Sequence, residues 1–295
     1  MTYEPVWGAI IAWYLFLAGL GGGAFVASAF LGWKHPNAVS MRKIGHIIAP
    51  IVVIIGLVLL IVDAEAGLHN PLRFALLLSN FGSVMTWGVV FLAGFVIISI
   101  IVVILDFVKK KVPVWLDIVG VVFALCVAAY TGALLGVAKT FPLWNNALIP
   151  VLFLVSAMSA GMAAVLLISV FTNAKEFDEV GIFKKFHFCF PLIEIVLVAA
   201  LLFITSSNST AGFASVASLI SGAYAPAFWI GLVIVGLVIP TILETCLLFF
   251  SSKKFEESGT AHTLSAASDI GILVGGFLLR YLIVVAALPL TLVVY

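Results

Sequence analysis

Long apolar stretches separated by short polar segments recur along the whole chain. Each stretch is long enough to cross a bilayer core of about 30 Å as a helix, which takes about 20 residues. The short segments of alternating polarity that are typical of membrane β-strands do not appear. We therefore predict an all-α polytopic membrane protein with eight transmembrane helices, at 7–32, 44–64, 82–106, 115–138, 147–171, 187–207, 224–250 and 264–290.

The basic residues indicate how these helices are oriented. Eleven of the 14 lysines and arginines lie in or beside the segments that follow the first, third, fifth and seventh stretches. Loops with an excess of Lys and Arg face the cytoplasm. We therefore expect these four segments on the cytoplasmic side of the cell's inner membrane, with both termini extracytoplasmic. The other three basic residues are Arg73, Lys139 and Arg280.

Composition agrees with a membrane protein and narrows its chemistry. The chain is 64% hydrophobic and 9% charged, whereas soluble domains carry about 25% charged residues. A net charge of +1 gives no basic surface for nucleic acid. Cys126, Cys189 and Cys246 lie singly in apolar stretches, so we expect neither an iron–sulfur cluster bound by this chain nor a disulfide framework.

The first stretch contains the unusual run "YLFLAGLGGGAF" at residues 14–25. Glycine costs a helix in water about 1 kcal/mol relative to alanine, but in a membrane small residues let helices pack closely. Gly19, Gly22 and Gly23 fall on one helix face, with Tyr14 one turn before them, about 10 Å into the membrane at 1.5 Å per residue. Two interpretations stay open: tight helix packing, or a slot that admits a flat aromatic ligand.

Polar side chains are concentrated near the expected outer ends of the helices. Ionisable groups are costly inside a membrane, at roughly 3 kcal/mol near its centre. Asp63, His69 and Tyr130 are the groups that could exchange protons with both carbonyl oxygens of a quinone. Interfacial anchoring of aromatic and long basic side chains is the alternative. The outer set is Tyr14, Asp63, Glu65, His69, Arg73, Asn80, Tyr130 and Lys139.

A second set of ionisable residues lies nearer the cytoplasmic side. Glu194, Glu244 and Asp269 are each about two helical turns from that face, and Arg280 lies deeper. They suggest either a proton route or an ion pair that stabilises this half of the protein. Asp106 and Asp117 are expected to be solvated loop residues.

The histidines are poorly placed for a haem, which needs facing histidines inside a helical bundle. One lies outside and the rest at or near the cytoplasmic ends. His46 and His187 are the pair that could just meet. We therefore expect no haem. The cytoplasmic set is His35, His46, His187 and His262.

Two segment pairs resemble each other within the chain. Residues 14–28 resemble 151–165, and residues 85–95 resemble 227–237, at offsets of 137 and 142 positions. Four helices separate each pair, which predicts a parallel repeat of two four-helix bundles, residues 1–140 and 141–295. Chance similarity between apolar stretches is the alternative.

Four motifs in order, "WYLFLAGLGGGAF", "SVMTWGVV", "YTGALL" and "FPLW", resemble the NrfD/PsrC family, the quinone-reactive membrane subunits of polysulfide reductase-like complexes. The resemblance implies two four-helix bundles without haem. It also implies a ferredoxin-like iron–sulfur subunit docked on the outer face, which connects to a larger catalytic subunit, a molybdopterin enzyme or a multihaem cytochrome. The implied ligand is menaquinone or another quinone.

The resemblance also implies roles for individual residues. Tyr130 matches the tyrosine that contacts the quinone, and Tyr14 occupies a polar position facing the headgroup. Ile10 stands where some relatives carry a second polar residue. A proton supply through the second bundle is implied for the family. Glu194, Glu244 and Arg280 fit it in residue type only.

We therefore expect (mena)quinone to be oxidised or reduced near the outer face of the first bundle. Tyr130 and Tyr14 would bind the headgroup, and Asp63 with His69 would relay protons. The glycine face and a few further residues would complete the pocket, namely Trp87, Arg73 and Lys139. The proton route would comprise Glu194, Glu244, Asp269 and Arg280.

Two other functions remain open. A secondary transporter would suit parallel repeats, and Glu244 after Pro240 could mark a broken helix. A purely structural anchor would leave the outer polar set without a role.

Overall fold

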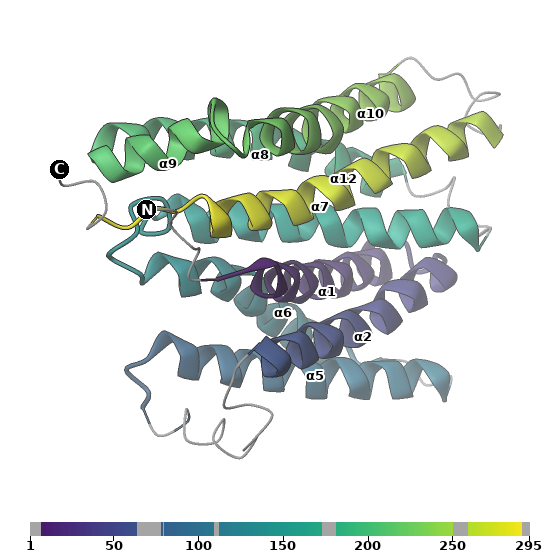
Figure 1. Ribbon diagram of the computed structural model, residues 1–295. Coiled ribbons are helices and arrows are strands. Elements are labelled where there is room, and N and C mark those ends of the chain that lie inside the picture. The colour runs from purple at the N-terminus through teal and green to yellow at the C-terminus, as the bar shows by residue number, and fades with distance from the viewer. Residues whose placement is uncertain are drawn as a thin grey trace.

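The computed structural model describes residues 7–63, 78, 80–108, 112–172, 181–249 and 259–290. Every regular element within these ranges is a helix (Figure 1). In chain order the helices are α1 (Ala9–Lys34), α2 (Val39–Asp63), α5 (Val84–Phe107), α6 (Val114–Gly136), α7 (Leu148–Phe171), α8 (Gly181–Asn208), α9 (Thr210–Ile220), η1 (Ala227–Val238), α10 (Ile239–Phe249) and α12 (Gly259–Val285).

The eight predicted membrane helices are confirmed within the described residues. Eight helices are long and apolar enough to cross a membrane, the seventh being formed by η1 and α10 together. The boundaries differ in places: α2 begins at Val39 rather than 44, and α12 ends at Val285 rather than 290. Helix α12 stops early because Pro289 follows closely, and proline cannot continue the helical hydrogen bonding.

The short helix α9 was missed, because residues 208–223 were expected to form a connection. Ser209 caps this helix: its hydroxyl accepts a hydrogen bond from the Gly212 backbone N–H at 3.0 Å. Serine is a favoured N-cap residue, so "SNST" before an apolar run was the available signal. The Ser215 hydroxyl then accepts from the Leu288 backbone N–H at 2.9 Å, which fastens α9 to the segment after α12.

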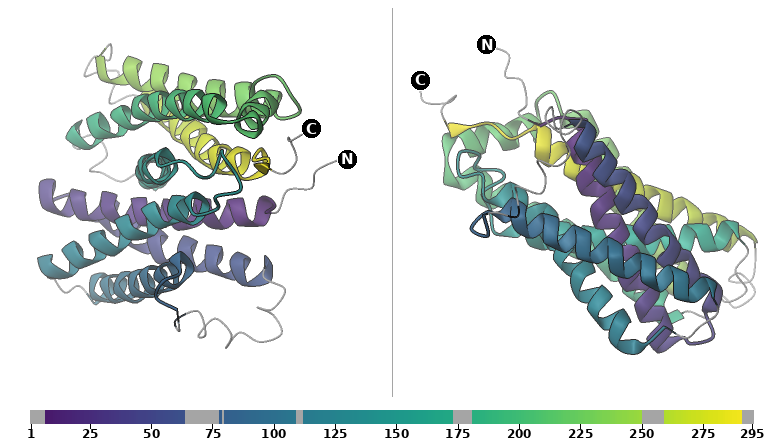
Figure 2. Two further views of the ribbon diagram at one scale, coloured as in Figure 1. Left: turned by 90° about the vertical axis from the view of Figure 1, so that its left-hand side faces the viewer. Right: turned by 90° about the horizontal axis from the view of Figure 1, so that it is seen from below.

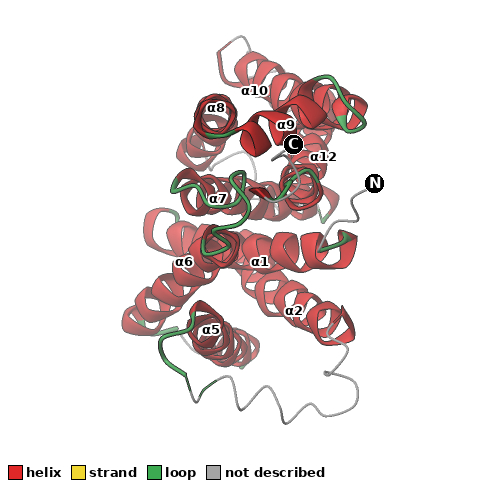
Figure 3. Ribbon diagram, turned by 60° about the vertical axis from the view of Figure 1, so that its left-hand side comes forward, coloured by secondary structure: helices red, strands yellow, loops and turns green. Residues whose placement is uncertain are grey.

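Within the described residues α1 packs on α2 and α6, and α5 also packs on α2 and α6; α7 packs on α8 and α12, and η1 and α10 pack on α12 (Figures 1 and 3). For reference we call α1, α2, α5 and α6 the first bundle and α7, α8, η1–α10 and α12 the second. Helices α1 and α6 pack against α7, and α1 also contacts α12. The first turn of α1 and the last turn of α12 lie at the same end of the molecule (Figure 2). We call this end the pocket end, because the cavity described below lies there.

The glycine run of α1 lets neighbouring helices approach closely, Gly19 and Gly23 toward the second bundle and Gly22 toward α6. A Cβ added at Gly23 would overlap the Ala157 carbonyl oxygen on α7, and one at Gly161 would overlap the Gly23 backbone. A Cβ at Gly22 would lie 2.8 Å from the Ala124 carbonyl oxygen on α6, and one at Gly19 2.8 Å from an Arg280 nitrogen. The packing interpretation of the run therefore describes the structure.

We predict that Gly23→Ala destabilises the protein, because the new methyl group forces two helix backbones apart. Overpacking of this kind costs about 1–3 kcal/mol, so the thermal unfolding midpoint of the purified protein should fall. Gly136→Ala is the matched control: the nearest atom to its Cβ, the Trp144 carbonyl oxygen, is 4.0 Å away. Equal midpoints for the two variants would contradict a close joint at Gly23.

Candidate functional site

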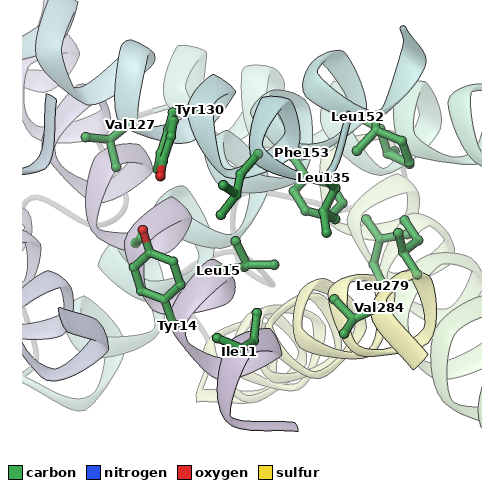
Figure 4. Close-up of a cluster of buried hydrophobic side chains, with 14 of the residues drawn as sticks. Ile11, Tyr14, Leu15, Val127, Tyr130, Leu135, Leu152, Phe153, Leu279 and Val284 are labelled. Carbon is green, nitrogen blue, oxygen red and sulfur yellow. The ribbon is translucent and has the colours of Figure 1, made fainter. Parts of the chain in front are cut away.

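Two buried tyrosines from different helices face each other in the first bundle. Tyr14 on α1 is 1% exposed and Tyr130 on α6 is 8% exposed, and their hydroxyl groups point toward one another (Figure 4). Tyr130 is the polar group that interacts with the Tyr14 hydroxyl, but the two hydroxyls do not reach full hydrogen-bond geometry, and the Tyr14 hydroxyl makes no such bond to any described residue. A Cβ at Gly88 on α5 would overlap the Tyr130 ring, so the glycine makes room for it. Tyr14 thus presents an unsatisfied buried hydroxyl, a group that is costly to leave without a partner.

A cavity of about 620 Å³ adjoins these tyrosines, between α1, α2, α5 and α6. Its lining is mainly apolar, with Leu57 and Leu60 on α2 and Met85 and Leu92 on α5 among the wall residues. Small-molecule sites typically measure 300–1,000 Å³ and combine apolar walls with a few polar groups. The cavity therefore has the size and character of a site for an apolar ligand with a polar head.

The structure brings three of the predicted site residues into this cavity. Tyr14, Tyr130 and Asp63 all line it. Asp63 is the last residue of α2 and is exposed, so its carboxylate lies at the rim while the two phenols lie further inside. This arrangement places an exchangeable proton site next to solvent and hydroxyl donors within the cavity.

Other predicted site residues lie elsewhere. Trp87 is 45% exposed, and its indole N–H donates to the Phe81 carbonyl oxygen at 3.1 Å, outside the cavity lining. Lys139 is exposed in the turn after α6 and does not line the cavity either. His69 and Arg73 fall outside the described residues.

The glycine face is also absent from the cavity lining. Gly19 and Gly23 face Arg280 and α7 of the second bundle, and Gly22 faces Ala124 of α6, so neighbouring helices fill the space that the missing side chains leave. Of the run 14–25, Tyr14 is the residue that lines the cavity. The expectation that the glycine face shapes this cavity is therefore corrected, because these glycines face α6, α7 and Arg280.

Arg280 is fully buried where α12 meets α1 and α7. Its guanidinium donates to the Ser156 hydroxyl at 3.1 Å, to the Gly276 carbonyl oxygen at 2.8 Å and to the Phe153 carbonyl oxygen at 3.2 Å. The Phe16 and Phe153 rings lie 5.8 and 5.1 Å from the guanidinium carbon. Neutral oxygens and aromatic faces thus hold this cation, and its charge acts on Glu194 without a direct ion pair among the described residues.

The three predicted acids of the second bundle are buried, and two of them meet a histidine. His187 Nε2 on α8 lies 3.0 Å from Asp269 Oδ1 on α12 and 3.9 Å from Glu244 Oε1 on α10. Glu194 is 4% exposed, and one of its carboxylate oxygens has no hydrogen-bond partner. The sequence pattern indicated the acids, but it suggested His187 only as a haem ligand.

The first bundle contains a comparable cluster that the sequence pattern did not predict. Asp106 Oδ1 pairs with Arg42 Nη2 at 2.9 Å, and Asp106 Oδ2 lies 2.6 Å from His46 Nδ1. Asp117 is close enough to feel these charges. Asp106 and Asp117 were expected to be solvated, but each is 6% exposed. The error arose because both residues lie in terminal turns of α5 and α6, next to polar segments, yet both side chains are buried there.

One sequence signal could have found both clusters. "KIGHIIAP" at 43–50 and "KKFHFCFP" at 184–191 share Lys, His and Pro at the same spacing, 141 positions apart. This offset lies between the two offsets of the internal repeat. Pro50 lies inside α2 and Pro191 inside α8. The shared pattern therefore places His46 and His187 at equivalent positions of the second helix in each bundle.

Comparison with known proteins adds to this geometry. The family model described as "Polysulphide reductase, NrfD" matches residues 1–291. The protein is 36% identical to the C subunit of polysulfide reductase from Wolinella succinogenes over 273 residues, which cover 82% of this chain and 84% of the relative.

Two further relatives match over nearly their whole length. The chain is 29% identical to the NrfD homolog of Haemophilus influenzae, covering 97% of this chain and 95% of the relative. It is 27% identical to NrfD of Escherichia coli, covering 94% of each. The chain, a multi-pass membrane protein with eight membrane-length helices among its described residues, thus belongs to the NrfD polysulphide reductase family.

Proposed function

We propose that this chain is the quinone-reactive membrane subunit of a respiratory oxidoreductase complex. The observation that carries the proposal is the cavity of about 620 Å³ with two phenols and a carboxylate in an otherwise apolar lining. Family membership supports it, since the Wolinella succinogenes relative is named as one subunit of a polysulfide reductase. A bound quinone, menaquinone in our proposal, supplies two-electron, two-proton chemistry.

The residues of the cavity have distinct tasks in this proposal. The Tyr14 hydroxyl, buried and without a partner among the described residues, donates a hydrogen bond to one oxygen of the headgroup. The Tyr130 hydroxyl, which faces it (Figure 4), binds and orients the same region of the headgroup. Asp63 exchanges protons between the cavity and the aqueous phase at the rim. Apolar walls from α2 and α5 exclude water, which strengthens these hydrogen bonds.

The proposed orientation follows from the basic residues. Lys34, Arg42 and Lys43 lie at the end opposite to the cavity, and loops rich in Lys and Arg face the cytoplasm. The pocket end then faces outward from the inner membrane. A ferredoxin-like iron–sulfur subunit docked at this end would exchange electrons with the quinone and pass them to or from a larger catalytic subunit.

The second bundle would contribute protons. Glu194 and Arg280 are both buried, and intramembrane ionisable residues commonly mark proton relays. Arg280 also lies against Gly19, five residues after Tyr14 on α1. The proposed route would thus approach the cavity from the second bundle.

Filling the cavity tests the proposal. We expect Ala93→Trp to reduce the quinone retained by the purified complex and to slow quinol turnover at least tenfold, because Ala93 lines the cavity and an indole would occupy ligand volume. Ile97→Trp is the matched control, one helical turn further along α5, 59% exposed and outside the lining. Unchanged quinone content and turnover in Ala93→Trp would refute this cavity as the site.

A further inference from the structure

The two histidine clusters occupy equivalent places in the two bundles but differ in one respect. In the first bundle His46 lies beside Asp106, and Arg42 pairs with that carboxylate at 2.9 Å. The position equivalent to Arg42, 141 residues further along, is Phe183, which is fully buried. The second cluster therefore lacks a guanidinium where the first has one.

The second cluster concentrates negative charge on one imidazole. His187 Nε2 lies 3.0 Å from Asp269 Oδ1 and 3.9 Å from Glu244 Oε1, and all three side chains are buried. The nearby cation is Lys184, whose charge acts on Asp269. Buried carboxylates need a compensating charge or hydrogen bonds to offset their lost hydration.

Two carboxylate oxygens of this cluster have no hydrogen-bond partner. Glu244 Oε1 and Asp269 Oδ2 are both buried and make no hydrogen bond within the described residues. A single proton on His187 Nε2 cannot satisfy them, because Asp269 Oδ1 already lies in hydrogen-bond range of that nitrogen. The ligand atoms of the three residues lie within 4.8 Å of one another. The three side chains thus approach one another closely, and two of their carboxylate oxygens can still accept a bond.

We propose that His187, Glu244 and Asp269 bind a divalent metal ion of the Zn²⁺ type. One imidazole nitrogen and two carboxylates suit Zn²⁺, whereas Mg²⁺ and Ca²⁺ prefer oxygen ligands alone. A divalent ion would neutralise both carboxylates, just as the guanidinium of Arg42 neutralises Asp106 in the first cluster. The ion would join α8, α10 and α12, three of the four spans of the second bundle.

The geometry requires an adjustment of about one ångström. Zinc ligands lie about 2.0–2.2 Å from the ion, so two donors at the tetrahedral angle are roughly 3.3–3.6 Å apart. The separation of up to 4.8 Å closes when the Glu244 side chain moves by about 1 Å, and its Oε1 makes no hydrogen bond to any described residue that would oppose this. A water molecule would complete four-coordination, as in other sites with three protein ligands.

Metal content of the intact complex tests this site. The complex, purified without chelators, should contain one zinc ion per copy of this chain beyond the metals of its partner subunits. After mild chelation the wild type should rebind added Zn²⁺, and its thermal unfolding midpoint should rise with Zn²⁺ concentration. Glu244→Gln should bind Zn²⁺ at least about tenfold more weakly, a loss comparable with that for damaged metal sites.

Glu194→Gln is the matched control, since it removes a buried carboxylate of the same bundle that is not part of the trio. It should keep wild-type zinc affinity. Equal Zn²⁺ binding by Glu244→Gln and wild type would overturn the proposal. A wild-type complex that neither contains nor rebinds a divalent ion would also overturn it and leave protons as the neutralising charge. If Glu244→Gln does not fold, wild-type metal content and the His187→Gln variant decide.

Discussion

Replacing Tyr130 by phenylalanine should lower quinol turnover by about 100-fold or more while the complex still assembles. The change removes one hydroxyl from the cavity and keeps the ring that packs beside Gly88. Positioned proton donors and acceptors typically contribute 10²–10⁴-fold to rate. The measurement is steady-state oxidation of a short-chain quinol, or reduction of the quinone, by the purified complex.

Tyr281→Phe is the control for this experiment. Tyr281 lies on α12, where its ring stacks near Phe277, and it does not line the cavity. It should leave turnover unchanged. Tyr14→Phe should also impair turnover, because the Tyr14 hydroxyl is buried without a partner among the described residues. Wild-type rates in Tyr130→Phe would refute its assignment to the headgroup.

Asp106→Ala should have the largest effect on stability. Asp106 holds Arg42 and His46 together at 2.9 and 2.6 Å. Removing one partner of a buried ion pair leaves the other charge uncompensated and costs about 3–5 kcal/mol, a cost reduced here because the Arg42 side chain is 24% exposed. We therefore expect a loss of roughly 2–3 kcal/mol, seen as a clearly lowered thermal unfolding midpoint and a lower yield from membranes.

The double variant Arg42→Met with Asp106→Leu separates charge from packing. Replacing both partners by apolar side chains leaves no unpaired charge, so much of the stability should return. His46 remains in both variants, its ring tilted against that of Phe25 with the ring centroids 5.3 Å apart. A double variant as unstable as Asp106→Ala would show that the carboxylate acts through His46 rather than through Arg42.

The eight spans could be predicted from sequence because length and hydropathy decide whether a segment crosses a membrane. The convergence of Tyr14, Asp63 and Tyr130 in one cavity was also within reach. Each lies toward the pocket end of its helix, since Tyr14 is near the start of α1, Tyr130 is near the end of α6 and Asp63 is at the end of α2. Successive membrane helices run in opposite directions, so these positions fall on the same side of the membrane. The position of a residue within its span therefore indicates how deep in the membrane it lies.

The sequence does not indicate in this way which helices lie side by side in the membrane. The glycines of α1 fitted both a pocket and a helix joint, and only the position of Ala157 on α7 distinguishes them. Asp106 and Asp117 looked like loop residues because they lie next to basic or polar segments. Asp106 pairs with Arg42 and His46, which come from a helix distant in sequence.

The contact between Gly23 and Gly161 limits how this protein can move. The backbones of the two helices touch at these glycines, so no side chain there can change rotamer to let the helices slide past each other. A secondary transporter that works by alternating access tilts one half of the protein against the other. Here such a motion would require α1 and α7 to separate at their backbone contact. We therefore expect the two halves to keep one relative position, which is compatible with electron and proton transfer and not with alternating access.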